Sequence, residues 1–303
     1  MALTTLPALC GFLNRLLGAP RPERVPFDRS GRIFLVLSMV LICSNGGLNL
    51  AMASEPDPEV SVCGSLREPL AFWLFRRAAG SADAGRVAGI PDIERIAFTT
   101  RDGRQLGGYR LRAAVPTGYL LVAQGNAMLA DQIARELQYF RNLGVDVYLY
   151  DYRGYGLSEG KSRLNAIVSD YREIVAHLNA LGYQRQLLYG MSMGGIILLN
   201  AVGASGDYSA LVIDSSPSRI SQYGCPKTYE PVNHLPADSS WIMVIAGERD
   251  RVVHPAEMEE LMLTAKSRGA HVLQHRDFAH PFQDATDDIH QRRFKAVADF
   301  LTR

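Results

Sequence analysis

The stretch 190–195, G-M-S-M-G-G, lies between two apolar runs and restricts the possible folds more than any other part of the sequence. Residues 187–189 before it are typical of a strand, and residues 196–199 after it are typical of a helix. A serine on such a sharp turn has strained backbone angles and needs small neighbours. The pattern therefore predicts that the Ser192 hydroxyl is held above a sheet, within reach of a base.

The same turn predicts a donor for a developing oxyanion. The backbone N–H of Met193, at the start of the helix, would point at the oxygen of a carbonyl attacked by Ser192. The pattern G-x-S-x-G alone is weak evidence, because its residues are common. Its place between a strand and a helix makes it informative.

Composition restricts the class of protein. The chain has 303 residues, of which 47% are hydrophobic and 21% charged, as in a soluble α/β enzyme with one catalytic domain. The net charge is +1 and no basic run is longer than a pair, so we expect no nucleic-acid partner. We find no metal-ligand spacing and expect neither a metal nor a cofactor.

The first 53 residues differ from the rest of the chain. Before residue 33, five arginines outweigh two carboxylates, and an apolar run broken only by Ser38 follows at 33–43. An A-M-A tripeptide then ends at Ala53. These are the parts of a secretory signal, so we expect cleavage before Ser54 and export to a periplasmic or other extracytoplasmic compartment.

Two tethered alternatives remain open for this segment. Residues 33–53 could serve as an uncleaved signal anchor, although the uninterrupted core is shorter than the roughly 20 residues of a bilayer span. Lipid attachment at Cys43 is the other, although the preceding Ile42 is larger than lipoprotein processing prefers. Either would associate the protein with a membrane through its N-terminal segment. A cytosolic start is the third alternative.

Residues 54–92 are predicted to form an N-terminal extension. Its small-residue part, 78–89, is typical of a loop, and the aromatic stretch 70–77 is expected to pack on the domain rather than on lipid. After signal cleavage the chain would keep two cysteines, Cys63 and Cys225. They could form a disulfide in an oxidising compartment or remain free small hydrophobic residues.

Regular strand and helix patterns begin at Ile93. Segments 95–100 and 106–111 alternate around an Asp-Gly turn and predict a hairpin. Short apolar runs then alternate with helical segments, the clearest of which has apolar residues at spacings of three and four from Leu164 to Leu181. The alternation predicts a mostly parallel sheet with helices on both faces. Its strands are expected at 118–123, 145–150, 187–189, 210–213, 242–246 and 271–273.

The loops after these strands supply the partners of the serine. Asp250 follows the run 242–246, and His280 follows the run 271–273. A serine, an acid and a histidine in this order are expected when a catalytic triad is mounted on such a sheet. We therefore assign Ser192 as nucleophile, His280 as general base and acid, and Asp250 as the carboxylate that orients the imidazole.

Other residues compete for two of these roles. Asp214 also follows a strand, and Glu248 is two residues from Asp250, so the acid is less constrained than the serine. Among the histidines, His254 is better explained as the residue that enters a helix beginning at Pro255.

From Ile93 to the C-terminus the chain resembles the α/β-hydrolase superfamily. Residues 151–160, D-Y-R-G-Y-G-L-S-E-G, resemble a loop of one membrane-associated branch that includes lysophospholipases and depalmitoylating thioesterases. The loop itself is interpreted as structural, with Arg153 paired internally. The branch usually has His-Gly-Asn after the third strand, whereas this chain has Gln124 followed by Gly-Asn. The resemblance implies that the main chain of Asn126 completes the oxyanion hole.

The resemblance implies a serine hydrolase of carboxylic esters or thioesters. Residues 215–240, where many relatives insert a lid, contain four prolines and no long helical pattern, which predicts a minimal cap and an open site. We expect a small-molecule or acylated substrate. The alternatives are a serine peptidase of the same fold and a catalytically silent hydrolase fold used for binding.

Overall fold

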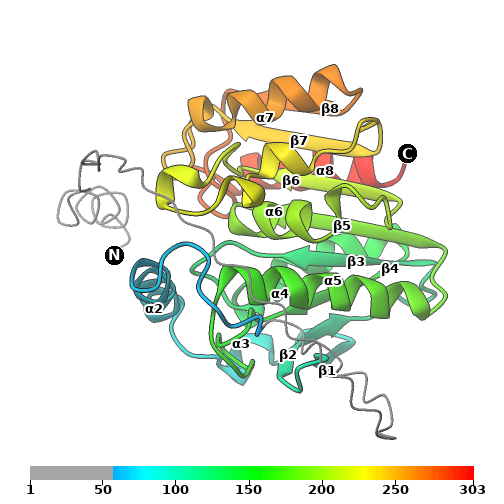
Figure 1. Ribbon diagram of the computed structural model, residues 1–303. Coiled ribbons are helices and arrows are strands. Elements are labelled where there is room, and N and C mark those ends of the chain that lie inside the picture. The colour runs from blue at the N-terminus through cyan, green and yellow to red at the C-terminus, as the bar shows by residue number, and fades with distance from the viewer. Residues whose placement is uncertain (1–56) are drawn as a thin grey trace, which may run out of the picture. The chain divides into compact units, whose positions relative to one another are not determined.

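The structure is a computed structural model that describes residues 57–303 (Figure 1). Its centre is one eight-stranded sheet with the strand order β1-β2-β4-β3-β5-β6-β7-β8. The pairs β1–β2 and β2–β4 are antiparallel, and all others are parallel. The sequence prediction of a mostly parallel sheet is confirmed. The strands are β1 (Ile93–Thr99), β2 (Gln105–Leu111), β3 (Gly118–Ala123), β4 (Val145–Tyr150), β5 (Arg185–Met191), β6 (Ala210–Asp214), β7 (Ile242–Gly247) and β8 (His271–His275).

Helices cover both faces of the sheet (Figure 1). Every residue of β3 and β4 is buried, and successive side chains point to opposite faces, so that Leu121 packs in one core and Leu120 in the other. The first core includes α5 (Leu164–Ala180), α6 (Met193–Leu198) and α7 (Pro255–Ser267). The second includes α4 (Ala130–Leu137), the 3-10 helix η1 (Gln138–Leu143) and α8 (Asp287–Leu301). The predicted helices from Leu164 and Pro255 are confirmed.

The N-terminal extension is more helical than its sequence suggests. It contains α2 (Arg67–Ala79) and α3 (Ala84–Val87), so the prediction of a loop at 78–89 is wrong at residues 78–79 and 84–87. Helix α3 forms because the Asp83 carboxylate accepts a hydrogen bond from the Gly85 N–H and caps its first turn. On α2, Phe72 is buried in the first core, as expected for part of the aromatic stretch.

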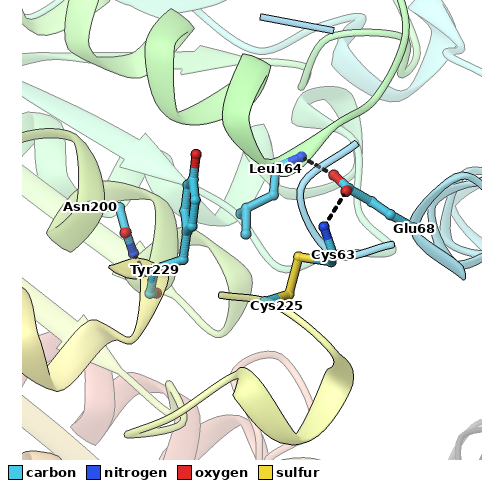
Figure 2. Close-up of a disulfide and its surroundings, with 6 residues drawn as sticks. All are labelled: Cys63, Glu68, Leu164, Asn200, Cys225 and Tyr229. Atoms are coloured by element: carbon cyan, nitrogen blue, oxygen red, sulfur yellow. Dashed lines mark hydrogen bonds between the residues drawn. A yellow bond between two sulfur atoms is a disulfide. The ribbon is translucent and has the colours of Figure 1, made fainter. Parts of the chain in front are cut away.

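Two contacts fasten the start of α2 to the catalytic domain (Figure 2). The buried Glu68 carboxylate accepts hydrogen bonds from the N–H groups of Cys63 and Leu164, both at 2.7 Å. Cys63 also forms a disulfide with Cys225, 162 residues further along the chain. The two cysteines, which the sequence left open as a pair or as free thiols, are therefore joined.

The segment between β6 and β7 is a short cap. The structure describes all of it, and its helical elements are three 3-10 helices, η3 (Ser221–Tyr223), η4 (Lys227–Tyr229) and η5 (Pro231–His234). The Asn200 amide, on the π-helix η2 (Leu199–Gly203), donates to the Tyr229 carbonyl at 3.0 Å and so connects the cap to η2 (Figure 2). The cap is also fixed to the N-terminal extension by the disulfide and to α7 by the Ser218 N–H, which donates to the Glu257 carbonyl at 2.8 Å.

We predict that removing the disulfide destabilises the protein without altering its chemistry. Because Cys63 and Cys225 close a loop of 162 residues, Cys225→Ala should lower the free energy of unfolding by about 2–5 kcal/mol. Urea denaturation, followed by circular dichroism, measures this change. Dithiothreitol should shift the midpoint of the wild type toward that of the variant and leave the variant unmoved. Equal midpoints for oxidised wild type and variant would contradict the prediction.

The N-terminal expectations fall on residues that the structure does not describe. The signal or anchor segment 1–53, including Cys43, lies outside residues 57–303. Within residues 57–303, no helix combines the length and the apolar content needed to cross a bilayer.

Candidate active site

Ser192 lies at the tight turn that joins β5 to α6. Its backbone has φ 54° and ψ −117°, a strained conformation for a residue with a side chain. The turn is held by the Ser192 N–H, which donates to the Asp214 carbonyl at 2.8 Å. At Gly194 a Cβ atom would overlap the Ala123 carbonyl, and at Gly190 it would come within 2.8 Å of the Gly194 backbone. Only glycine allows β3, β5 and α6 to approach so closely.

Asp250 and His280 meet at the carboxyl ends of neighbouring strands. Asp250 lies just beyond β7 and His280 just beyond β8, and the His280 Nδ1 is 2.9 Å from the Asp250 Oδ2. The other carboxylate oxygen accepts the N–H groups of Val252 and Val253 at 2.8 and 2.9 Å. This arrangement fixes the carboxylate, which in turn orients the imidazole so that Nε2 is free to exchange a proton.

The surroundings keep Asp250 ionised. Burial alone would raise the pKa of its carboxyl. The hydrogen bond and the charge of His280, together with the N–H donors of Val252 and Val253, lower this pKa by more than burial raises it. The resulting pKa lies below the ordinary value of an aspartate. Ser192, Asp250 and His280 are only 7, 2 and 9% exposed, so electrostatic interactions among them are poorly screened by water.

Asp214, the competing acid, has different partners. It is fully buried and accepts hydrogen bonds from the Arg293 guanidinium at 2.6 Å and from the Tyr189 hydroxyl at 2.9 Å. The other competitor, Glu248, is an exposed residue whose carboxylate meets the Gln274 amide at 3.3 Å. The histidine is therefore bonded to Asp250, and Asp214 is neutralised by an arginine.

Arg293 also positions the loop that carries the histidine. Its guanidinium donates to the Ala279 carbonyl at 2.5 Å and to the Asp284 carboxylate at 3.0 Å, and Asp284 accepts the Ala279 N–H at 2.9 Å. Ala279 directly precedes His280, so this buried network fixes the backbone from which the imidazole projects. Sequence reasoning missed Arg293 and Asp284, because nothing near them distinguishes them from surface charges of a helix and a loop.

The loop after β3 passes beside the nucleophile. A Cβ atom at Gly125 would lie 3.9 Å from the Ser192 Cβ, which brings the main chain of Asn126 to the same side of the site. The buried Gln124 amide donates to the Tyr150 carbonyl at 2.9 Å, and the Tyr152 hydroxyl donates to the Gln124 carbonyl at 2.5 Å. The loop after β3 is thus held by hydrogen bonds to Tyr150 of β4 and to Tyr152 in the loop that follows β4.

The motif 151–160 supplies more of this bracing. The Asp151 carboxylate accepts the Ala130 N–H at 2.7 Å and the Leu157 N–H at 2.9 Å, which joins the loop after β3 to the loop after β4. Arg153 is paired internally, as the sequence predicted, with Asp170 at 3.0 Å and Asp102 at 2.9 Å. The motif therefore supports the loop after β3.

The arrangement contains groups of the kinds that acyl transfer requires. Asp250 and His280 are directly bonded, while the hydrogen bonds of residues 57–303 include none between Ser192 and His280. Such bonds often form only when substrate is bound. The Met193 N–H lies at the first turn of α6, where helical N–H groups have no partner within the helix, and can serve an oxyanion. Within the described residues no cluster of three or more His, Cys, Asp or Glu could hold a metal ion.

Comparisons with known proteins find similar sequences. Residues 114–237 match the model of a family described as serine aminopeptidase, S33. The chain is 24% identical over 234 residues to the uncharacterized protein YfhR of Escherichia coli, covering 69% of this chain and 80% of the relative. It is also 24% identical over 245 residues to the uncharacterized membrane protein YNL320W of Saccharomyces cerevisiae, covering 74% and 84%.

Solved structures share the fold. The Pyrococcus furiosus esterase Pf2001 superimposes with a TM-score of 0.57 at 17% identity, covering 74% of this chain and 96% of the esterase. XC6422 of Xanthomonas campestris, a serine hydrolase without a lid, gives a TM-score of 0.51 at 18% identity, covering 70% and 92%. With its eight-stranded, mostly parallel sheet and helices on both faces, the protein has the fold of the α/β-hydrolase superfamily.

Proposed function

We propose that the protein is a serine hydrolase that cleaves carboxylic ester or thioester bonds through an acyl-enzyme intermediate. The observation that carries the proposal is the buried Asp250–His280 hydrogen bond, which lies at the same end of the sheet as the strained serine turn. The resemblance to esterases of the same fold supports it.

Each catalytic step has a residue to perform it. Ser192 Oγ attacks the carbonyl carbon as His280 Nε2 takes its proton, and the N–H groups of Met193 and Asn126 stabilise the oxyanion. His280 then gives the proton to the departing alkoxide or thiolate, which leaves an acyl group on Ser192. A water molecule, deprotonated by His280, releases the acid and restores the serine. Asp250 stabilises the imidazolium in both halves.

Several features favour esters or thioesters presented on larger molecules or carrying small acyl groups. The cap is short, so the site is not roofed by a helical lid. The motif 151–160 resembles the branch of lysophospholipases and depalmitoylating thioesterases. A serine peptidase is the second candidate, favoured by the description of the family model that matches residues 114–237.

A fluorophosphonate probe tests the chemistry directly. We expect the purified protein to be labelled at Ser192, located by peptide mass spectrometry, and to hydrolyse p-nitrophenyl esters of graded chain length and a thioester. Peptide substrates tested in parallel separate the peptidase. A folded sample that takes up no probe would instead support a silent binding protein.

The role of Gln124 gives a quantitative prediction. Gln124→Ala removes the amide that braces the oxyanion loop against Tyr150, so turnover should fall by about tenfold, less than the loss of a direct oxyanion donor. Gln124→His restores a donor for the same carbonyl and should keep or raise the rate. Steady-state kinetics on one ester, with a probe titration of active serines, measures both effects. A rate unchanged by Gln124→Ala would contradict the bracing role.

We also propose that the protein is exported and has Ser54 as its mature N-terminus. The charge and apolar pattern of residues 1–53 supports this, and so does the Cys63–Cys225 disulfide, because disulfides persist in oxidising compartments. Intact-mass spectrometry of the protein from fractionated cells checks both points. An intact Met1 in a soluble cytosolic fraction would overturn them, and an intact N-terminus in the membrane fraction would indicate an uncleaved anchor.

A further inference from the structure

One face of α2 presents large apolar side chains to solvent. Leu66, the N-cap residue of α2, is 84% exposed, and Leu70 and Trp73 within the helix are 40 and 49% exposed, whereas Phe72 is buried in the core. Their spacings of four and three residues place them on one side of the helix, and we call these three residues the α2 stripe. Single exposed apolar residues are ordinary, but three on one helix face are typical of a binding surface.

The exposed charges on α2 itself have one sign. Arg67 and Arg77 are exposed on the same helix, and the Arg77 guanidinium lies 5.9 Å from the centre of the Trp73 ring. The helix has one acidic residue, Glu68, and this carboxylate is buried and bonded to two backbone N–H groups. An apolar stripe with a tryptophan and arginines, and with no exposed carboxylate, complements an anionic lipid surface.

The position of α2 in the chain agrees with such a surface. In the sequence, Leu66 lies 23 residues after Cys43, the last residue of the apolar run 33–43, and this run follows a surplus of arginines. In the alternative in which that segment stays uncleaved as an anchor, α2 is the first helix after it among the described residues 57–303. The disulfide between Cys63 and Cys225 fixes the chain to the cap three residues before Leu66.

Helix α2 also packs over the end of the sheet that carries the candidate active site. Arg76 donates to the Gly154 carbonyl at 3.3 Å, and the Ala79 carbonyl accepts from Gln132 at 2.8 Å. Gly154 and Gln132 belong to the segments that follow β4 and β3. These segments begin at the carboxyl ends of the strands, which is the end of the sheet where Ser192 lies. In Figure 1, α2 lies beside this end of the sheet.

We propose that the α2 stripe inserts into the surface of a bilayer that contains anionic lipids. The three apolar side chains enter the boundary between headgroups and acyl chains, and Arg67 and Arg77 lie near lipid phosphates. This orientation brings the end of the sheet that carries Ser192 toward the membrane. If the proposed function holds, it favours acyl substrates presented at the membrane surface.

Fluorescence of Trp73 on vesicles tests the proposal. The protein is expressed from the full sequence with the substitution Trp241→Phe, so that Trp73 is its one tryptophan. The purified variant is mixed with vesicles of phosphatidylcholine and phosphatidylglycerol. We expect the emission to shift to shorter wavelength and to lose about half its intensity or more when the acyl chains are brominated, because interfacial helices lie about 5–10 Å into the boundary. Vesicle-bound protein whose Trp73 is not quenched would overturn the proposal.

A matched pair of variants separates the α2 stripe from general stickiness. The double change Leu66→Ser with Leu70→Ser should reduce the quenching and weaken vesicle partition by about tenfold, whereas Leu263→Ser, at a 61% exposed leucine of α7, should change neither. Equal effects of both variants would overturn the proposal. So would sedimentation velocity showing a dimer that the double variant dissociates, because a second copy would then cover the stripe. Vesicle binding needs no turnover, so an inactive enzyme would refute the proposed function and leave this result standing.

Discussion

Ser192→Ala is expected to reduce ester hydrolysis by about 10⁶-fold, to the residual rate that binding and the oxyanion donors alone can support. The change removes the attacking oxygen and little else. The turn is held by the main chain, through the Ser192 N–H on the Asp214 carbonyl at 2.8 Å and the Ser216 hydroxyl on the Ser192 carbonyl at 2.7 Å. Alanine keeps both contacts, so the fold should survive.

The measurement is kcat on the best p-nitrophenyl ester, with circular dichroism and thermal unfolding to show that the variant is folded. Ser267→Ala, at a serine on α7, is a control that removes a hydroxyl elsewhere and should leave kcat unchanged. Undiminished turnover by pure Ser192→Ala would eliminate the nucleophile assignment, and loss of fluorophosphonate labelling in the same variant would strengthen it.

Local patterns in the sequence were sufficient to predict the sheet. Each strand from β3 to β7 contains a run of mostly apolar, buried residues, and the turn at Gly103, where φ is 80°, separates the two hairpin strands. The N-terminal extension could not be predicted in this way. Helix α2 depends on a buried carboxylate bonded to Leu164 and on a disulfide to Cys225, contacts with residues about 100 and 160 positions away.

The candidate site divides along the same line. Ser192 has a local signature, because a strained turn needs glycine at nearby positions. The orienting acid has none, since Asp214 and Asp250 both follow a strand. What distinguishes them is Arg293, 79 residues from Asp214 in sequence, which pairs with one aspartate and leaves the other to the histidine. One sequence, taken by itself, gives no indication of the contact between Arg293 and Asp214.

The pair Asp250→Asn and Asp214→Asn converts this distinction into an experiment. Asp250→Asn places an amide where His280 needs a carboxylate, so the imidazole would be held in the wrong tautomer and its charged form would lose a stabilising partner. We expect kcat to fall by about 10⁴-fold with little change in the unfolding midpoint. Both substitutions are isosteric, so the size of the side chain is matched.

Asp214→Asn should have the opposite profile. Arg293 is fully buried, and removing one of its two carboxylate partners leaves part of its charge uncompensated, which typically costs about 3–5 kcal/mol of stability. Because Asp284 still holds Arg293 at 3.0 Å and the Ala279 N–H at 2.9 Å, His280 should stay in place and kcat of the folded fraction should fall by less than about tenfold. Urea denaturation and active-site titration separate the two effects. If Asp214→Asn instead causes the 10⁴-fold loss while Asp250→Asn stays active, Asp214 is the catalytic acid and His280 must turn toward β6 during the reaction.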